Sequence, residues 1–521
     1  MQPLVRLLRQ AVRCLFLLLQ MLLQPPLSAI LTWWYPATTV SPVTDEVLLL
    51  SAVEIADRIR TKKVTAVEVM QRFIQRVKAV NPVVNAVVVD MFSEALEAAG
   101  NVDRQLAEDD SSVKNLPLLG VPLSVKEAFQ VKGMPSCSGL WTRRNNKAPS
   151  TAAVVRHLKA AGAIPFILTN TSELCMWYES ANNVYGRTNN AYSTSHIVGG
   201  SSGGEGCILS TGASVMGVGS DIGGSIRMPA FFNGVYGHKP SRGVVDNSGQ
   251  HPPATGSQVD LLVTGPLCRY AADLLPLMQI MSGDASQLNL KKKVDLKELR
   301  FFSMENDGGG LLQSNVNQEL VAAQKKAVVY LEHTLGVRVT TLNLRRMKYS
   351  MEMWSARMTS SDGTTFSEFM AGEKGSVNGL YELFRWLIGR SHHTLPAIML
   401  AVIECFTPLL EGSNAQFLKM LTEFEKEMRE LLDDGGILLY PSHPCSAQLH
   451  NQPLSTPTNF SYTAIFNALG LPVTQCPLGL NKSGLPVGVQ IVGGMYEDRN
   501  TIAVAQALEA GPGGWVTPGQ M

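Results

Sequence analysis

Hydrophobic positions along this chain follow two periods, one typical of helices and one typical of buried strands. Val69, Phe73 and Val77 recur at the spacing of one helix face. Residues 152–161 also have a helical pattern, and the short apolar run at 164–168 that follows them is typical of a buried strand. Strand-like and helix-like segments alternate again in the C-terminal half. This alternation predicts an α/β fold.

Two pairs of polar residues predict where helices begin. Ser51 with Glu54, and Thr65 with Glu68, have the spacing of a capping box, in which each side chain accepts a hydrogen bond from the other residue's backbone amide. A helix is therefore expected after each pair. Because proline cannot donate the backbone hydrogen bond that a helix interior needs, the second helix is predicted to end at residues 81–82.

A short apolar run at 118–125, interrupted by Gly120 and Pro122, predicts a buried strand that ends next to Lys126. A free ammonium group has a pKa of about 10.4, so Lys126 can act as a base at neutral pH only if burial or a positive neighbour favours its neutral form. The alternative is a surface ion pair with Glu127. On the pattern alone, the ion pair is the more ordinary interpretation.

The N-terminal apolar segment, residues 14–35, is close to the 20 residues that a helix needs to span a bilayer. It predicts a membrane anchor within residues 1–44, followed by one large domain over residues 45–521. Pro25 and Pro26 interrupt the segment. A cleaved signal peptide, a kinked span and a helix lying in one leaflet are therefore the alternatives.

The charges on either side of this segment give an expectation for its orientation. Its N-terminal side carries Arg6, Arg9 and Arg13, whereas residues 35–50 contain only acidic charges. By the positive-inside tendency, a spanning helix would keep the N-terminus cytosolic and place the large domain in the lumen. The sequence favours this arrangement over a helix in one leaflet, which would leave both parts cytosolic.

A second apolar region covers residues 381–410. Its most apolar stretch, 395–410, is interrupted by prolines and a glutamate and is too short for a confident span. Two interpretations stay open, a helical pair buried inside the domain and a helical pair that contacts a membrane.

Composition narrows the class of protein. Hydrophobic residues make up 45% of the chain and charged residues 17%, which fits a large core with some membrane-facing surface. The net charge of +1 argues against a nucleic-acid partner. Eight cysteines are scattered without a CxxC pair, and no HExxH motif occurs. The sequence therefore predicts reduced cysteines, no metal site and no cofactor.

Residues 199–227, GGSSGGEGCILSTGASVMGVGSDIGGSIR, are unusually rich in glycine and serine. Because glycine loses the most backbone entropy on folding, such a cluster indicates that backbone must approach something closely. Ser201, Ser202 and Ser225 are candidate nucleophiles beside free backbone amides, as in an oxyanion hole. A phosphate-binding loop is the alternative, but GxxxxGK[ST] does not occur here. Asp221 is expected to brace the loop through hydrogen bonds to its backbone.

The patterns GGSSGGE, SDIGGSIR and VPLSVKEAF resemble the amidase signature family of serine hydrolases, from about residue 48 to the C-terminal region. The resemblance implies a Ser-Ser-Lys triad at Lys126, Ser201 and Ser225, with Ser201 following a cis peptide bond. It also implies a single domain in which α-helices cover a twisted mixed β-sheet. It assigns no base role to His238.

Further site residues are expected around this triad. The oxyanion hole is predicted to consist of the backbone amides of Ile222, Gly223, Gly224 and Ser225. Met176 and Ser202 are predicted to contact the substrate. For Met176 the alternative is an ordinary place in the core.

Within the family, the apolar N-terminus makes the chain most similar to the membrane-anchored fatty-acid amide hydrolases, particularly their second type. This similarity implies hydrolysis of long-chain fatty-acid amides to fatty acid and amine or ammonia, through an acyl-enzyme on Ser225. In such hydrolases an insertion corresponding to 381–410 caps the acyl channel and dips into the bilayer. The alternatives are a hydrolase of short-chain or aryl amides and a non-catalytic membrane scaffold.

The implied partners are a lipid amide, a second copy of the chain in a homodimer, and a membrane. Attachment by a single pass or as a monotopic protein, at the endoplasmic reticulum or a lipid droplet, is the expected location.

Overall fold

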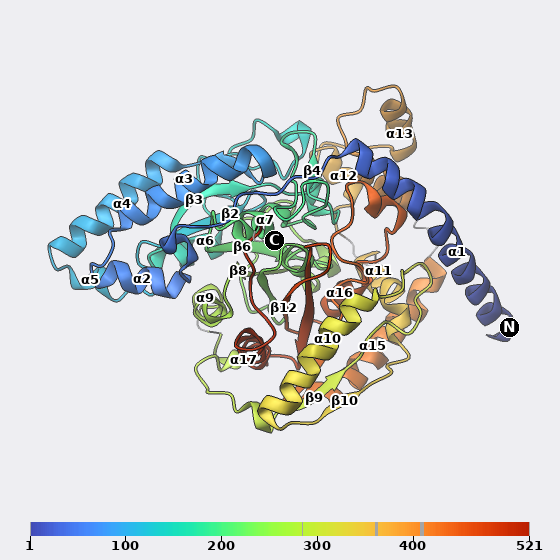
Figure 1. Ribbon diagram of the computed structural model, residues 1–521. Helices are drawn as coiled ribbons and strands as arrows, with labels where there is room; N and C mark the ends of the chain where they lie inside the picture. Colours follow the sequence, from blue (N-terminus) through green and yellow to red (C-terminus); the bar gives the residue numbers. More distant parts are fainter. Residues whose placement is uncertain (1, 284, 360–362, 407–410, 520–521) are drawn as a thin grey trace.

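The computed structural model describes residues 2–283, 285–359, 363–406 and 411–519. Within these residues, eleven strands form one sheet at the centre of the molecule (Figure 1). In spatial order they are β1 (Val87–Asp90), β3 (Ile164–Thr169), β2 (Pro122–Lys126), β6 (Met216–Asp221), β8 (Val263–Cys268), β7 (Tyr236–Lys239), β12 (Val473–Leu480), β13 (Pro486–Gly493), β11 (Gly436–Tyr440), β9 (Arg300–Ser303) and β10 (Val339–Thr341). A separate short pair consists of β4 (Ala181–Asn182) and β5 (Gly186–Arg187).

Helices surround this sheet. In chain order they are α1 (Gln2–Trp34), α2 (Ala52–Arg60), α3 (Ala66–Val84), α4 (Phe92–Ala107), α5 (Ser111–Lys114), α6 (Ala153–Ala160), α7 (Gly203–Ser210), α8 (Arg227–Phe232), α9 (Leu274–Met281), α10 (Gln318–Tyr330), α11 (Ser350–Thr359), α12 (Phe366–Met370), α13 (Gly379–Leu387), α14 (Leu395–Cys405), α15 (Glu411–Leu432), α16 (Ser461–Ala468) and α17 (Asp498–Glu509).

Hydrogen bonds show that the sheet is covered on both faces. Thr474 of β12 is bonded to Thr501 of α17, with 2.9 Å between their hydroxyl oxygens. Gln490 of β13 accepts a hydrogen bond from Arg227 of α8 at 3.3 Å. Thr474 is the cross-strand partner of Ile491, so these two side chains face the same side of the sheet. Gln490 is next to Ile491 along β13, and successive strand residues face opposite sides, so Gln490 faces the other side. Helices α17 and α8 therefore pack on opposite faces, as expected for an α/β fold.

The directions of the central strands bring the motif that contains Lys126 and the glycine-rich motif after β6 together. Strand β2 is parallel to β3 and β6, whereas β6 is antiparallel to β8, so the sheet is mixed as predicted. Because β2 and β6 are parallel neighbours, their C-terminal ends meet at the same edge of the sheet. These ends carry Lys126 and Asp221.

The predicted helix starts are confirmed, but one predicted end is wrong. Both capping boxes are present, at the N-termini of α2 and α3. Helix α3 continues through Pro82 to Val84. It ends where Asn85 adopts a left-handed conformation with φ of 50° and donates its amide to the carbonyl of Asn81 at 2.8 Å. Pro82 lies in the last turn, where its missing amide removes a single hydrogen bond.

The two apolar regions are both helical. Helix α1 runs without a break through Pro25 and Pro26, and its residues Arg9–Trp34 are long and apolar enough to cross a membrane. Residues 381–387 belong to α13 and residues 395–405 to α14, with a short connection between them. The predicted segment's last residues, 407–410, lie outside the described part of the chain. On α13, Tyr381, Phe384 and Leu387 are all more than half exposed.

Candidate active site

Strand β2 ends by delivering Lys126 into the interior. The lysine side chain is fully buried, and its Nζ lies 2.7 Å from Ser201 Oγ and 3.0 Å from Ser220 Oγ. The surface ion pair with Glu127 is wrong, because Glu127 is also buried and binds elsewhere. Its carboxylate accepts hydrogen bonds from the amides of Cys137 and Ser138, each at 2.7 Å.

Burial changes the acid–base character of Lys126. Loss of solvation lowers the pKa of its ammonium group below the ordinary value, because the charged form is unfavourable in the protein interior. Cys175, Asp221 and Glu205 oppose this shift and raise the pKa. The net shift is downward, toward the neutral amine, which is the form that can accept a proton.

Ser201 lies at the turn into α7. The peptide bond between Gly200 and Ser201 is cis, as the resemblance implies. Glycine is required before it, since a Cβ at position 200 would lie 2.3 Å from the carbonyl oxygen of Trp177. A Cβ at Gly203 would lie 2.3 Å from Ser180 Oγ. The glycine cluster therefore allows backbone and neighbouring chain to pack closely around the Ser201 hydroxyl.

Asp221 braces the loop that carries Ser225, as predicted. Its carboxylate accepts hydrogen bonds from the backbone amides of Gly224 at 2.7 Å and Ile226 at 3.0 Å, and it forms an ion pair with the guanidinium of Arg227 at 2.9 Å. Burial alone would raise the pKa of Asp221, but the charge and hydrogen bonds of Arg227 hold it well below its ordinary value. The carboxylate stays ionised and fixes the loop.

The carbonyl groups of the same loop are also held. Trp354 Nε1 donates to the carbonyl of Ile222 at 2.9 Å, and Thr463 Oγ1 donates to that of Gly223 at 2.7 Å. Of the four predicted oxyanion donors, the Gly224 amide is already bonded to Asp221. In the described part of the chain, the amides of Ile222, Gly223 and Ser225 have no protein acceptor. Three of the four predicted donors are therefore open.

The chain segments that carry Ser201 and Ser225 are joined by a backbone hydrogen bond, but the two serine side chains are not bonded to each other. The amide of Ser202 donates to the carbonyl of Ser225 at 3.1 Å. Among the described residues, no hydrogen bond joins the hydroxyls of Ser201 and Ser225. Ser225 retains 8% exposure, whereas Ser201 has 1%. The structure thus brings Lys126 and Ser201 into contact and leaves the Ser225 hydroxyl open; in substrate-free sites such catalytic bonds are often long.

The two predicted substrate residues differ in their surroundings. Ser202 is fully buried, and its hydroxyl donates to the carbonyl of Ser220 in β6 at 3.4 Å. Met176 is partly exposed and directly follows Cys175, whose thiol lies 3.4 Å from Thr171 Oγ1. His238 is fully buried between Thr474 and Asp498, in agreement with a structural role.

Sequence reasoning missed Glu205, the last residue of GGSSGGE. Its fully buried carboxyl accepts hydrogen bonds from Ser124 at 2.6 Å and Thr169 at 2.8 Å. Ser124 precedes Lys126 by two residues on the same face of β2, and Thr169 is the cross-strand partner of Lys126. Burial raises the pKa of Glu205 to about 7. The motif itself was the available signal, because an acidic residue is unusual inside so apolar a helix.

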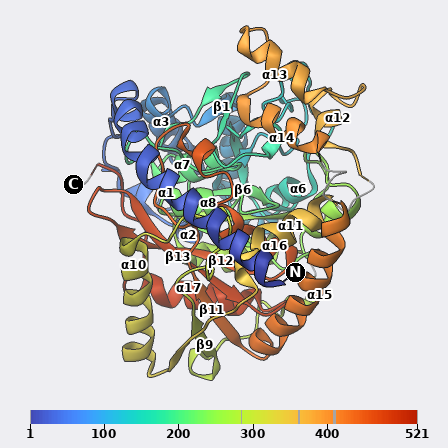
Figure 2. The ribbon, with the colours of Figure 1, turned by 90° about the vertical axis from the view of Figure 1, so that its right-hand side faces the viewer.

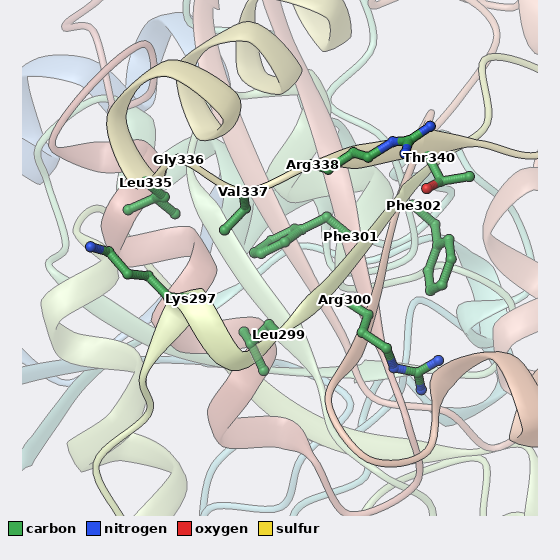
Figure 3. Close-up of a pocket in the computed structure, with 10 residues that line it drawn as sticks. All are labelled: Lys297, Leu299, Arg300, Phe301, Phe302, Leu335, Gly336, Val337, Arg338 and Thr340. Carbon is green, nitrogen blue, oxygen red and sulfur yellow. The ribbon is translucent and has the colours of Figure 1, made fainter.

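Among the described residues, no group of three or more His, Cys, Asp or Glu side chains could hold a metal ion. A surface hollow lies several strands away, at the far end of the sheet beside its edge strands β9 and β10 (Figure 3). Its lining contains Phe301, Val337 and Arg338 and none of the predicted site residues.

Comparison with known proteins agrees with this site. Residues 68–502 match the model of the family described as Amidase. The chain is 52% identical to fatty-acid amide hydrolase 2 of Homo sapiens over 93% of both chains, and 53% identical to fatty-acid amide hydrolase 2-A of Danio rerio over 92% of both. A solved structure of fatty acid amide hydrolase superposes with a TM-score of 0.71 at 22% identity, covering 89% of this chain and 85% of that one.

The match covers both strands that end at the site, the glycine- and serine-rich loops and the C-terminal half of the sheet. The solved structure has the same fold. By sequence, by fold and by the arrangement of its buried lysine and serines, this chain belongs to the amidase family.

Proposed function

We propose that this protein is a serine amidase in which Ser225 is the nucleophile, Ser201 the proton relay and Lys126 the base. The observation that carries the proposal is the 2.7 Å contact between the buried Lys126 amine and the Ser201 hydroxyl. A neutral Lys126 accepts the proton of Ser201 while Ser201 accepts that of Ser225. The Ser225 oxygen then attacks the amide carbonyl and forms an acyl-enzyme.

The same two groups complete the reaction in reverse order. Ser201 returns a proton to the leaving amine as the carbon–nitrogen bond breaks, and Lys126 reprotonates Ser201. Water then attacks the acyl-enzyme along the same proton path and releases the carboxylic acid. Open backbone amides at Ile222, Gly223 and Ser225 stabilise the negative carbonyl oxygen, an effect of roughly 3 kcal/mol for each donor.

The substrate class proposed is the long-chain fatty-acid amide, hydrolysed to fatty acid and amine or ammonia. The 52% identity to a fatty-acid amide hydrolase supports it. Apolar surroundings support it as well, since a Cβ at Gly223 would lie within 3.5 Å of the rings of Trp354 and Phe460. Each CH₂ group buried against such side chains contributes about 0.8 kcal/mol. An acyl chain placed beside this loop would therefore bind more strongly as it lengthens.

Attachment to a membrane through α1 fits this substrate. Long-chain amides concentrate in lipid, and Arg9–Trp34 has the length and hydropathy of a membrane helix. An enzyme held at a lipid surface meets its substrate where the substrate is concentrated.

The test compares specificity constants for oleoyl and acetyl amides. We expect kcat/KM to be much higher for the oleoyl amide and turnover to be lost in Ser225→Ala. Equal specificity constants would favour a short-chain amidase and remove the lipid assignment. Near-full turnover by Ser225→Ala would remove the proposed nucleophile. If Ser202→Ala impaired turnover far more than Ser201→Ala, the relay assignment would be wrong.

A further inference from the structure

Helix α1 contacts the body of the protein at several points between Arg9 and Tyr35. Its partly buried positions recur every three or four residues and so form one face: Arg13, Phe16, Gln20, Gln24, Leu27 and Leu31. Figure 2 shows α1 crossing the face of the molecule as one diagonal helix. A helix that left the body to cross a bilayer would contact it at one end only.

Polar contacts fix both ends and the middle of this helix. Arg9 forms an ion pair with Glu352 at 2.6 Å, and Arg13 donates to the side chain of Asn315 at 2.9 Å. Gln20 Nε2 donates to Ser314 Oγ at 3.0 Å. These contacts hold the N-terminal half of α1 against the loop at 310–315 and against α11.

The C-terminal end of the helix is held in the same way. The side chain of Asn451 donates to the hydroxyl of Tyr35 at 3.0 Å, and the Tyr35 ring meets the His450 ring edge to face at 5.4 Å. From Arg9 to Tyr35 an α-helix is about 39 Å long. The hydrocarbon core of a bilayer is only about 30 Å thick. The docked length thus exceeds a complete span.

The outward face of α1 is apolar. Leu15, Leu18 and Leu22 are each about half exposed or more, and at the C-terminal end Trp33 and Trp34 are 79% and 66% exposed. Tryptophan favours the boundary between acyl chains and headgroups. Leucines along one face with tryptophans at the end are typical of a helix lying in a membrane interface.

We propose that α1 lies in the plane of a single phospholipid leaflet, with its inward face on the catalytic domain and its outward face in the acyl region. The N-terminus and the catalytic domain then lie on the same side of the membrane. This inference deepens the membrane attachment proposed above and rests on it. It replaces the luminal arrangement that the flanking charges favoured.

The energetic reason is the set of polar contacts that a spanning helix would lose. To cross the bilayer, α1 would have to detach from the domain and carry the amide of Gln20 into the hydrocarbon without Ser314. Glu352 would at the same time lose Arg9 as its partner. Polar groups without partners are unfavourable in lipid, whereas a helix in the interface keeps every one of these contacts.

Photo-crosslinking tests the arrangement directly. The full-length chain is reconstituted with phosphatidylcholine vesicles and carries p-benzoylphenylalanine at one position at a time. The inward positions are Gln20 and Gln24, and their matched outward controls are Leu19 and Leu22. We expect the outward positions to form phospholipid adducts and the inward positions to form crosslinks within the same chain, Gln20 with residues 310–315.

Each other outcome overturns the inference. Phospholipid adducts at all four positions would show a helix detached from the domain and inserted across the bilayer. Crosslinks between two chains at Leu19 and Leu22 would show that a second copy covers this face instead. The same crosslinks are expected in Ser225→Ala, so the result is independent of whether the proposed catalytic mechanism holds.

Discussion

Lys126 connects the fold to the proposed chemistry at the scale of a single residue. A lysine on the surface keeps its proton at neutral pH, and the buried position of Lys126 at the end of β2 weakens that preference by lowering its pKa. The serine hydroxyls around its Nζ, those of Ser201 and Ser220, supply hydrogen bonds without supplying charge. A neutral amine is thereby accommodated in a fully buried site.

Lys126→Ala is expected to lower kcat/KM about 10²- to 10⁴-fold at neutral pH, the range for loss of a general base. Activity should recover partly at alkaline pH, where hydroxide can accept the proton. In the unaltered enzyme, activity should fall as the pH drops and Lys126 becomes protonated. The exposed Lys132, changed to Ala, is the matched control and should leave the pH–rate profile unchanged. Equal losses at every pH would argue against a base role.

Glu205→Gln is expected to move the acid limb of the kcat/KM profile to lower pH. The Glu205 carboxylate stabilises the ammonium form of Lys126 and so raises the pKa of Lys126. Glutamine has the same shape but no charge, so the lysine loses its proton at a lower pH. The measurement is a pH–rate profile beside that of Glu108→Gln, an exposed position. A shift to higher pH, or none in a folded variant, contradicts this electrostatic role.

At the scale of elements, the loop between β6 and α8 is rigid because separate elements hold its two sides. Asp221 at the end of β6 accepts hydrogen bonds from backbone amides of the loop, while Trp354 of α11 and Thr463 of α16 donate to carbonyl groups of the loop. Arg227 at the start of α8 completes the arrangement, with both guanidinium edges engaged. The proposed oxyanion donors are therefore fixed before substrate arrives, which is what makes such donors effective.

Arg227→Ala is expected to lower the free energy of unfolding by about 3–5 kcal/mol, because it leaves the Asp221 carboxylate buried without its partner. Urea denaturation followed by circular dichroism measures the change. The comparison is Arg346→Ala, which breaks more exposed pairs with Glu423 and Glu427 and should change stability by about 1 kcal/mol or less. Similar losses in the two variants would show that burial of the Asp221 pair contributes little.

At the scale of the whole molecule, local patterns were readable from the sequence and long-range packing was not. Capping boxes and the strand at Lys126 depend on residues close in sequence. The sequence predicted both capping boxes and the existence of the strand, although the strand begins at Pro122 and not at Leu118. The place of Glu205 could not be predicted, because Ser124, Thr169 and Gly217 come from three different strands. Gly217 makes room for it, since a Cβ there would lie 1.8 Å from the carboxylate.

The docking of α1 was hidden for a related reason. The helix is apolar on most of its surface, so its sequence alone favours a span. Its inward face becomes visible only beside its partners Asn315 and Glu352, about three hundred residues away along the chain.

Trapping of the acyl-enzyme tests the central claim most directly. The full-length protein is mixed with an oleoyl anilide, quenched in acid within the first turnovers, digested and mapped by mass spectrometry. We expect an oleoyl ester on Ser225 that is absent from Ser225→Ala. An oleoyl adduct on any other residue, or steady turnover with no adduct on Ser225, would contradict the account.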